Sequence, residues 1–122
     1  MTPLFPVMLG GAIGAGLRYI TAVLLMPRMQ SGWPWATFAV NLLGGFAMGL
    51  LFAHLMKGNV GETTRLFVGV GILGGFTTFS AFSLESWQMI ERGNWALAGG
   101  YALASVIGSI MALGSGIWMA RA

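Results

Sequence analysis

A run of glycines and hydroxyl-bearing residues, Gly74-Gly75-Phe76-Thr77-Thr78-Phe79-Ser80, lies in the middle of an apolar stretch of the chain. Adjacent glycines weaken a helix, and an interrupted helix frees backbone carbonyl and amide groups that lipid cannot hydrate. Such groups are tolerated at membrane depth only where protein buries them or where they line a cavity. A tightly packed kink, whose threonine hydroxyls bond to the preceding turn, is the structural alternative. The run therefore predicts either a functional break or a packed kink.

Uncharged polar and aromatic residues recur at helical spacing around this run. Phe79 and Phe82 lie three residues apart and share a helix face. The other stripes are Ser80 with Ser83, Thr37 with Asn41, and Tyr101 with Ser105 and Ser109. Each stripe alone is consistent with hydrogen bonding between helices. Together they offer amide and hydroxyl donors and positive ring edges, with no lysine or arginine expected beside the run, which favours passage of a small hydrated anion.

The elements that carry these residues are predicted to be membrane-spanning helices. The chain has 122 residues, of which 57% are hydrophobic and only 7% are charged, values that exclude an ordinary soluble domain. Four apolar stretches, 4–26, 35–56, 63–90 and 95–119, approach or exceed the roughly 20 residues that a helix needs to cross a bilayer. They show no strand-like alternation. We therefore expect an all-α membrane protein with a single transmembrane domain over residues 1–122, whose third helix is broken mid-membrane.

The ionisable residues exclude several other functions. The chain has one histidine, three acidic residues and no cysteine, a set that provides no credible pairing of nucleophile and base, so we do not expect an enzyme. Its six basic residues are scattered near the ends of the spans, as membrane-surface anchors are, and do not predict nucleic-acid binding. A proton-coupled exporter of the small multidrug-resistance kind needs a carboxylate in its first span, and residues 4–26 contain none. A membrane subunit without transport activity is a third alternative, in which the polar stripes serve only packing.

The basic residues are balanced between the two ends of the predicted spans. Lys57, Arg65 and Arg121 lie on one side, while Arg28 and Arg92 lie on the other, with Arg18 nearer to the latter. This balance gives the chain little electrostatic preference for one orientation. If both orientations coexist, two copies can pair around a two-fold axis in the membrane plane. We therefore expect an antiparallel homodimer.

Small residues spaced four apart predict close helix packing. The chain has 20 glycines, far above the soluble average. Glycines four apart occur in three spans, Gly10 with Gly14, Gly45 with Gly49, and Gly71 with Gly75, and the fourth span has small residues at the same interval, Gly100, Ala104, Gly108, Ala112 and Gly116. Such ridges let helix backbones approach each other in a bilayer, where association depends on van der Waals contact.

In four segments the chain resembles the small fluoride channels of the Fluc family, also called CrcB. These segments are Gly11-Ala12-Ile13-Gly14-Ala15-Gly16-Leu17-Arg18-Tyr19, Thr37-Phe38-Ala39-Val40-Asn41, Gly74 to Phe82 with Ser83 and Glu85 beyond, and the pair Tyr101 and Ser105. The third segment is the most specific. The chain departs from the family pattern at Ala36, where glycine is common, and at Ala81, where threonine is frequent, so a polar contact at position 81 is in doubt.

The resemblance implies a passive, fluoride-selective channel in the bacterial inner membrane, built as an antiparallel dual-topology homodimer with two pores. It implies a structural sodium ion held at the dimer centre by backbone carbonyls of Gly74 and Thr77. It further implies that Phe79 and Phe82 line the pore with their ring edges, that Asn41 and Ser105 contribute donors, and that Thr37, Ser80, Tyr101 and Glu85 lie along or near the pathway.

Arg18 and Glu85 are expected to support the pathway without contacting the ion. Arg18 lies near the end of the first span, where its side chain can snorkel or bond the C-terminal carbonyls of a neighbouring helix. A permanently charged carboxylate in an anion path would repel the ion. Glu85 is therefore expected to bond a nearby hydroxyl or to reach interfacial water.

Overall fold

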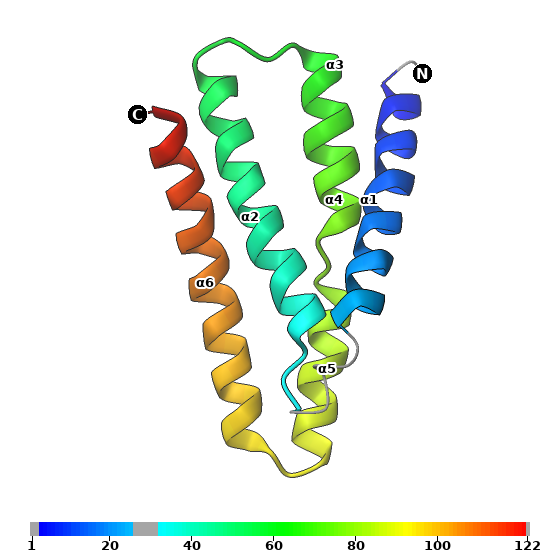
Figure 1. Cartoon of the computed structure of the whole chain (residues 1–122), viewed down its shortest axis with the longest axis vertical. Helices are drawn as coiled ribbons and strands as arrows, with labels where there is room; N and C mark the ends of the chain where they lie inside the picture. The colour runs from blue at the N-terminus through cyan, green and yellow to red at the C-terminus, as the bar shows by residue number, and fades with distance from the viewer. Residues whose placement is uncertain (1–2, 26–31, 122) are drawn as a thin grey trace.

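The computed structural model describes residues 3–25 and 32–121, which form a bundle of long helices (Figure 1). The first, second and last spans are the continuous helices α1 (Leu4–Leu25), α2 (Trp35–Met56) and α6 (Trp95–Arg121). The third span is composite and contains α3 (Glu62–Thr64), η2 (Arg65–Leu73), α4 (Gly74–Phe76) and α5 (Ser80–Glu91). The expected end of the first span at Met26 and the basic residue Arg28 lie outside the described residues.

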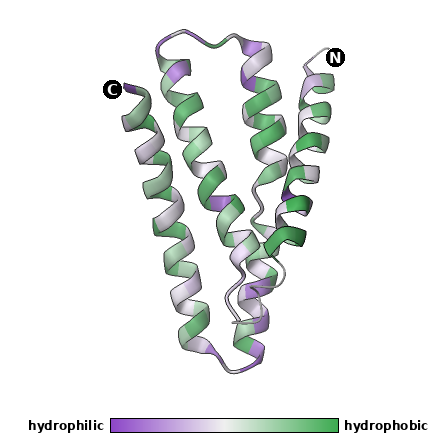
Figure 2. Ribbon diagram, in the orientation of Figure 1, coloured by the Kyte–Doolittle hydropathy of each residue, from purple (hydrophilic) through white to green (hydrophobic). Residues whose placement is uncertain are grey.

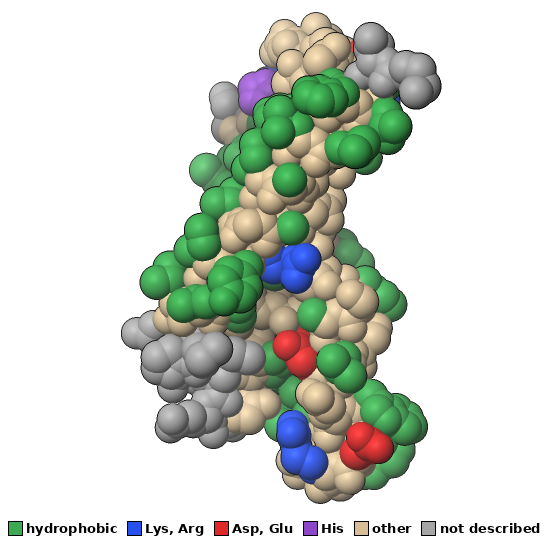
Figure 3. All heavy atoms as spheres, turned by 90° about the vertical axis from the view of Figure 1, so that its right-hand side faces the viewer, with side chains coloured by type: hydrophobic (Ala, Val, Ile, Leu, Met, Phe, Trp, Pro, Cys, Tyr) green, Lys and Arg blue, Asp and Glu red, His purple; other side chains and the backbone are tan. Residues whose placement is uncertain are grey.

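The prediction of an all-helical protein with four segments able to cross a membrane is confirmed for the described residues. Leu4–Leu25, Trp35–Met56, Glu62–Glu91 and Trp95–Arg121 are each long and apolar enough to span a bilayer. Hydrophilic residues gather in the loops and at the helix ends, and a few lie within the spans (Figure 2). Apolar side chains are spread along the face in Figure 3 between uncharged side chains and backbone, with a few charged side chains in its middle and lower parts. Such a surface suits contact with lipid.

The four spans pack as two close pairs, α2 along α6 and α1 along η2 and α4 (Figure 1). Glycines allow both contacts. A Cβ atom added at Gly71 would lie 2.9 Å from the Cα of Gly10, so α1 and η2 meet backbone to backbone. On the other pair, a Cβ at Gly49 or Gly116 would collide with backbone atoms of the facing helix. The packing role predicted for these glycines is therefore confirmed, whereas Gly100 faces open space.

The third span departs from regular α-helix before its interruption. Residues Arg65–Leu73 form a π-helix, the wider winding that is defined by hydrogen bonds from an amide to the carbonyl five residues earlier. The sequence analysis did not predict this wider winding. Long π-helical stretches are rare, and shorter ones often occur at functional sites.

An interruption separates α4 from α5 at residues 77–79. The backbone remains helical through Phe76, because the Thr77 amide still bonds to the Leu73 carbonyl at 3.0 Å. Thr77 is then extended, with φ −84° and ψ 160°, and the chain re-enters a helix at Ser80. The break therefore begins three residues later than Gly74, where the run of glycines had placed its start.

Candidate functional site

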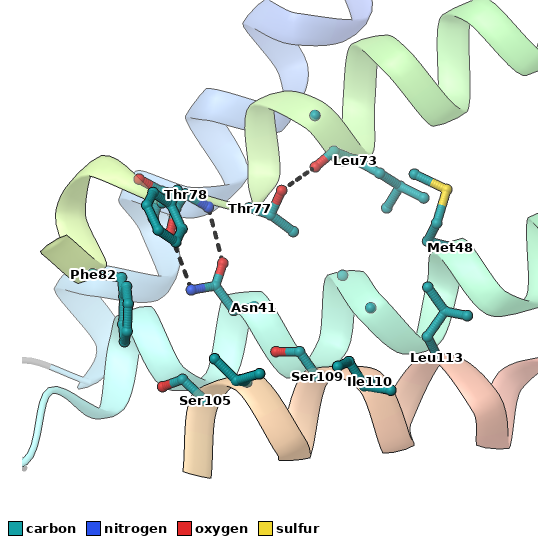
Figure 4. Close-up of a pocket in the computed structure, with 15 residues that line it drawn as sticks. Asn41, Met48, Leu73, Thr77, Thr78, Phe82, Ser105, Ser109, Ile110 and Leu113 are labelled. Carbon is teal, nitrogen blue, oxygen red and sulfur yellow. Dashed lines mark hydrogen bonds between the residues drawn. The ribbon is translucent and has the colours of Figure 1, made fainter. Parts of the chain in front are cut away.

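Asn41 on α2 holds the interruption by two hydrogen bonds to one backbone residue. Its Oδ1 accepts from the Thr78 amide at 2.9 Å, and its Nδ2 donates to the Thr78 carbonyl at 3.1 Å (Figure 4). A carboxamide has one donor group and one acceptor, which match the amide and carbonyl of a peptide unit. Asn41 thereby satisfies both backbone groups of Thr78.

Two carbonyls near the break lack their usual helical donors. In a continuous helix the Thr78 amide would bond to the Gly74 carbonyl and the Ala81 amide to the Thr77 carbonyl. Here the Thr78 amide bonds to Asn41, and the Ala81 amide bonds to Thr78 Oγ1 at 3.1 Å. The carbonyls of Gly74 and Thr77 are thus left free of these donors, and both residues line a cavity.

Arg18 on α1 also contacts the break. Its Nε donates to the Gly75 carbonyl at 3.1 Å, which confirms the expected bond to carbonyls near the end of a neighbouring helix. The expectation that no lysine or arginine is fixed beside the run was wrong. The glycine contacts between α1 and the third span bring their backbones together, and Arg18 lies one turn beyond Gly14 on that face of α1.

The two threonines of the run have different roles. The Thr77 hydroxyl donates to the Leu73 carbonyl at 2.9 Å, as the packed-kink alternative predicted. Thr78 Oγ1 accepts from the Ala81 amide and so acts as a cap for the first turn of α5. Ser80 is exposed and its Oγ lies 3.4 Å from Thr78 Oγ1. The break therefore contains elements of both predictions, a bonded kink and freed carbonyls.

A cavity of about 440 Å³ opens between α2, α6 and the break (Figure 4). Its lining includes four of the predicted pore residues, Asn41, Phe79, Phe82 and Ser105. Thr77, Thr78 and Ser109 add hydroxyl-bearing side chains, and the rest of the lining consists of glycine and apolar side chains. No charged side chain lines this cavity among the described residues. Its polar groups are therefore hydroxyls, one carboxamide and the backbone.

Glu85 on α5 accepts hydrogen bonds from two neighbouring helices. The Thr37 hydroxyl of α2 donates to Oε2 at 2.8 Å, and the Tyr101 hydroxyl of α6 donates to Oε1 at 2.9 Å. This confirms the expected bond between Glu85 and a nearby hydroxyl. Thr37 and Tyr101 are buried, so their hydroxyl protons are directed at the carboxylate. The two stripes to which they belong thus also join helices.

Two smaller cavities lie beside Glu85. One, of about 310 Å³, is lined by Trp33, Glu85, Gln88, Arg92 and Asn94 among others. The second, of about 210 Å³, includes Arg18, Thr37, Thr78 and Glu85 in its lining. Glu85 is common to these two cavities, and Thr78 is common to the 210 Å³ and 440 Å³ cavities. The three cavities are therefore neighbours, in an order that leads from the loop end of the bundle to the break.

The two phenylalanines predicted to line a pore differ in their surroundings. Their ring centroids lie 5.5 Å apart, and the Phe82 ring also contacts Tyr101 at 5.1 Å. Phe79 is 76% exposed, whereas Tyr101 is fully buried behind Phe82. Within the described chain, Phe82 is thus supported by protein on one side while Phe79 extends outward.

Thr78 and Ser109 are the residues that sequence reasoning undervalued. Thr78 was recognised only as part of the run, although a threonine three residues before the amide that it caps is a familiar helix-start signal. Ser109 was recognised as part of a stripe, and its place on the cavity wall follows from its spacing of four from Ser105.

Comparison with known proteins gives a consistent picture. Residues 5–117 match the family described as CrcB-like protein, Camphor Resistance (CrcB). The chain is 53% identical to the fluoride-specific ion channel FluC of Sphingopyxis alaskensis over 122 residues, covering 99% of this chain and 97% of that one. It is 50% identical to the protein of the same name from Mesorhizobium japonicum, covering 99% of this chain and 98% of the relative. A Chelativorans relative of that name is 51% identical with the same coverage.

Replacing Asn41 by leucine tests whether this side chain holds the break. Asn41→Leu removes both bonds to Thr78 and leaves a part-buried amide and carbonyl without them, so we expect local stability to fall by about 2 to 4 kcal/mol. Hydrogen exchange at the Thr78 amide measures this change, because the amide should exchange much faster in the variant.

Ser83→Ala is the matched control, since the Ser83 hydroxyl makes one exposed bond to the Phe79 carbonyl. Exchange at Thr78 should stay slow in this control. An amide that exchanged equally slowly in Asn41→Leu would show that Asn41 does not hold the break.

Proposed function

Because the chain belongs to the CrcB-like family, we propose that it is a fluoride channel that carries fluoride passively across the bacterial membrane. The four apolar helices make it a multi-pass membrane protein. The observation that carries the mechanism is the 440 Å³ cavity, which presents amide, hydroxyl and aromatic groups without a charged side chain. Transport of this kind needs no catalytic residue.

An uncharged lining suits the permeation of a small anion. Fluoride must exchange its hydration shell for protein donors, and it must leave again, which a fixed cation in the cavity would hinder. Asn41 uses one of its two Nδ2 hydrogens for the Thr78 carbonyl, and the second remains for an anion. Ser105, Ser109 and the positive ring edges of Phe79 and Phe82 add further weak sites.

The neighbouring cavities suggest the route from the loop end to this uncharged cavity. An ion would pass from the 310 Å³ cavity, beside Glu85, to the 210 Å³ cavity and then past Thr78. Arg18 also lines the 210 Å³ cavity, and its positive charge partly offsets the repulsion from Glu85. The Thr37 and Tyr101 hydroxyls donate hydrogen bonds to Glu85 and stabilise its charged form, so Arg18 is the group that offsets the repulsion.

Passive fluoride export is useful to a cell because hydrogen fluoride is neutral and crosses membranes unaided. It dissociates in the more alkaline interior, where the anion becomes trapped. A channel then lets the accumulated anion leave down its gradient. The small multidrug-resistance alternative is not supported, since Leu4–Leu25 contains no carboxylate and the relatives are fluoride-specific channels.

We propose that the active form is an antiparallel homodimer. In a lone chain the break, the 440 Å³ cavity and the exposed Phe79 ring would face lipid, where irregular backbone is not tolerated. A second copy placed over this face would enclose them. The balanced basic residues support the antiparallel arrangement, because they give neither orientation an advantage.

We further propose a structural sodium ion where the two breaks would meet. The carbonyls of Gly74 and Thr77 fit this role because their helical donors are bonded elsewhere. Within the described ranges no three His, Cys, Asp or Glu side chains gather, so a cation in this part of the chain would depend on backbone oxygen. Bound sodium would neutralise the carbonyl dipoles of the break. The residues of this chain hold the carbonyls in place, chiefly through Asn41 and Arg18.

Fluoride efflux from liposomes that contain the purified protein tests the channel. Wild-type protein should release fluoride, and Phe79→Ile or Phe82→Ile should reduce the flux by at least about fivefold, because each removes an aromatic edge worth about 1 kcal/mol or more. Phe52→Ile is the control, since Phe52 is a half-exposed phenylalanine of α2 away from the cavity.

Absence of flux from folded wild-type dimers would contradict the proposed function. Wild-type flux in both cavity variants would instead contradict the ring-edge mechanism and leave the channel itself intact.

Dual topology is tested by single cysteines, because the chain has none of its own. Asn59→Cys lies in the loop between α2 and α3, and Asn94→Cys lies at the opposite end, between α5 and α6; both positions are exposed. If the two orientations are equally populated, a membrane-impermeant maleimide should label about half of each variant from outside. Complete labelling of one variant and none of the other would exclude dual topology.

Sodium removal tests the proposed ion. Replacing sodium by N-methylglucamine should lower the unfolding free energy of the dimer by about 2 to 3 kcal/mol, the linkage expected at roughly 100 times the dissociation constant. In Asn41→Leu the unfolding free energy should no longer depend on sodium, because Asn41 no longer holds the break. Equal melting temperatures of the wild type in both buffers would contradict a bound sodium.

A further inference from the structure

The aromatic residues near Glu85 form a continuous chain of ring contacts. The Phe79 ring contacts the Phe82 ring, and the Phe82 ring contacts the Tyr101 ring at a centroid distance of 5.1 Å. Tyr101 in turn meets Trp33 edge to face at 5.3 Å and 81°. The chain therefore extends from the break to the turn that precedes α2.

Trp33 is itself held by α2 and by the turn. Its ring meets Phe38 edge to face at 5.4 Å and lies 6.0 Å from Trp35. The residue is half-buried and lines the 310 Å³ cavity together with Glu85. Trp33 thus ends the series of ring contacts and also forms part of the wall of that cavity.

Tyr101 is fixed at both ends. Its hydroxyl donates to Glu85, and its ring packs between Trp33 and Phe82 in a buried cluster with Met89 and Ala98. A side chain so confined transmits the position of one neighbour to the other, because a packed interior leaves little room for independent movement. Phe79 gives Phe82 much weaker support, since it is itself 76% exposed.

We propose that Trp33 is a positioning residue for the pore-lining ring of Phe82 and that it acts through Tyr101. This inference rests on the proposed fluoride conduction, in which Phe82 offers its ring edge. The attraction between an anion and a phenyl ring depends on orientation, because the edge is positive and the face is negative. Without Trp33, the Tyr101 ring gains space towards the 310 Å³ cavity, and Phe82 turns away from its productive orientation.

Flux measurements on substituted dimers test this role. Trp33→Leu and Trp33→Met remove the ring, and each should lower fluoride flux by about fivefold, the factor that corresponds to one aromatic pair. Trp33→Phe keeps an aromatic ring and should restore flux to within about twofold of the wild type. Trp87→Leu is the control, because Trp87 lies on α5 with Phe82 but is exposed and has no ring partner among the described aromatic pairs.

A second measurement reports the Trp33–Tyr101 contact without reference to flux. The chain has two tyrosines, so Tyr19→Phe leaves Tyr101 as the sole site for 3-fluorotyrosine. Its fluorine resonance should shift when Trp33→Leu is added and should not shift with Trp87→Leu.

Wild-type flux in dimers of Trp33→Leu and Trp33→Met would overturn the proposal, as would an unchanged fluorine resonance. Loss of the dimer in both variants would also overturn it, because Trp33 would then serve assembly and not the position of Phe82. If the wild type itself passes no fluoride, the proposed function fails, and the resonance still decides whether Trp33 positions Tyr101.

Discussion

A break in a membrane-spanning helix leaves amide and carbonyl groups that lipid cannot hydrogen-bond, and each bare group costs several kcal/mol. The arrangement of this protein around residues 77–79 follows from that constraint. Asn41 satisfies both backbone groups of Thr78, Thr78 caps the next helix, and Arg18 bonds the Gly75 carbonyl. The glycine contacts of α1 place Arg18 close enough to do so. The break is thus a bonded structure supported from two other helices.

This way of satisfying the break also determines what remains available for ions. The carbonyls of Gly74 and Thr77 lose their helical donors and suit a cation, whereas the donors of Asn41, Ser105 and the phenyl edges suit an anion. The fixed charges of Arg18 and Glu85 stay outside the uncharged cavity. A proposed sodium site and a proposed fluoride path can therefore lie side by side without sharing ligands.

The sequence predicted the features that depend on local composition. The four spans follow from apolar length, and a close-packing role for Gly10 and Gly71 follows from their spacing, although that spacing did not show that these two glycines face each other. The start of the break was placed too early, because glycines permit a break without requiring one, and the helix continues to Phe76. The π-helix of Arg65–Leu73 has no evident composition signal. Asn41 and Arg18 form hydrogen bonds with Thr78 and Gly75, which lie 37 and 57 residues away in the sequence. The spacing of residues within one helix cannot predict such contacts.

The central proposal is that this chain is a fluoride-selective channel whose pathway includes the cavity of neutral donors. Its most direct test is the reversal potential of the wild-type protein in a planar bilayer, with fluoride on one side and an equal concentration of chloride on the other. The account predicts a current carried by fluoride alone. The reversal potential should therefore lie far from zero, with the sign expected for fluoride permeation. A reversal potential near zero would mean that both anions pass equally, and it would contradict the account.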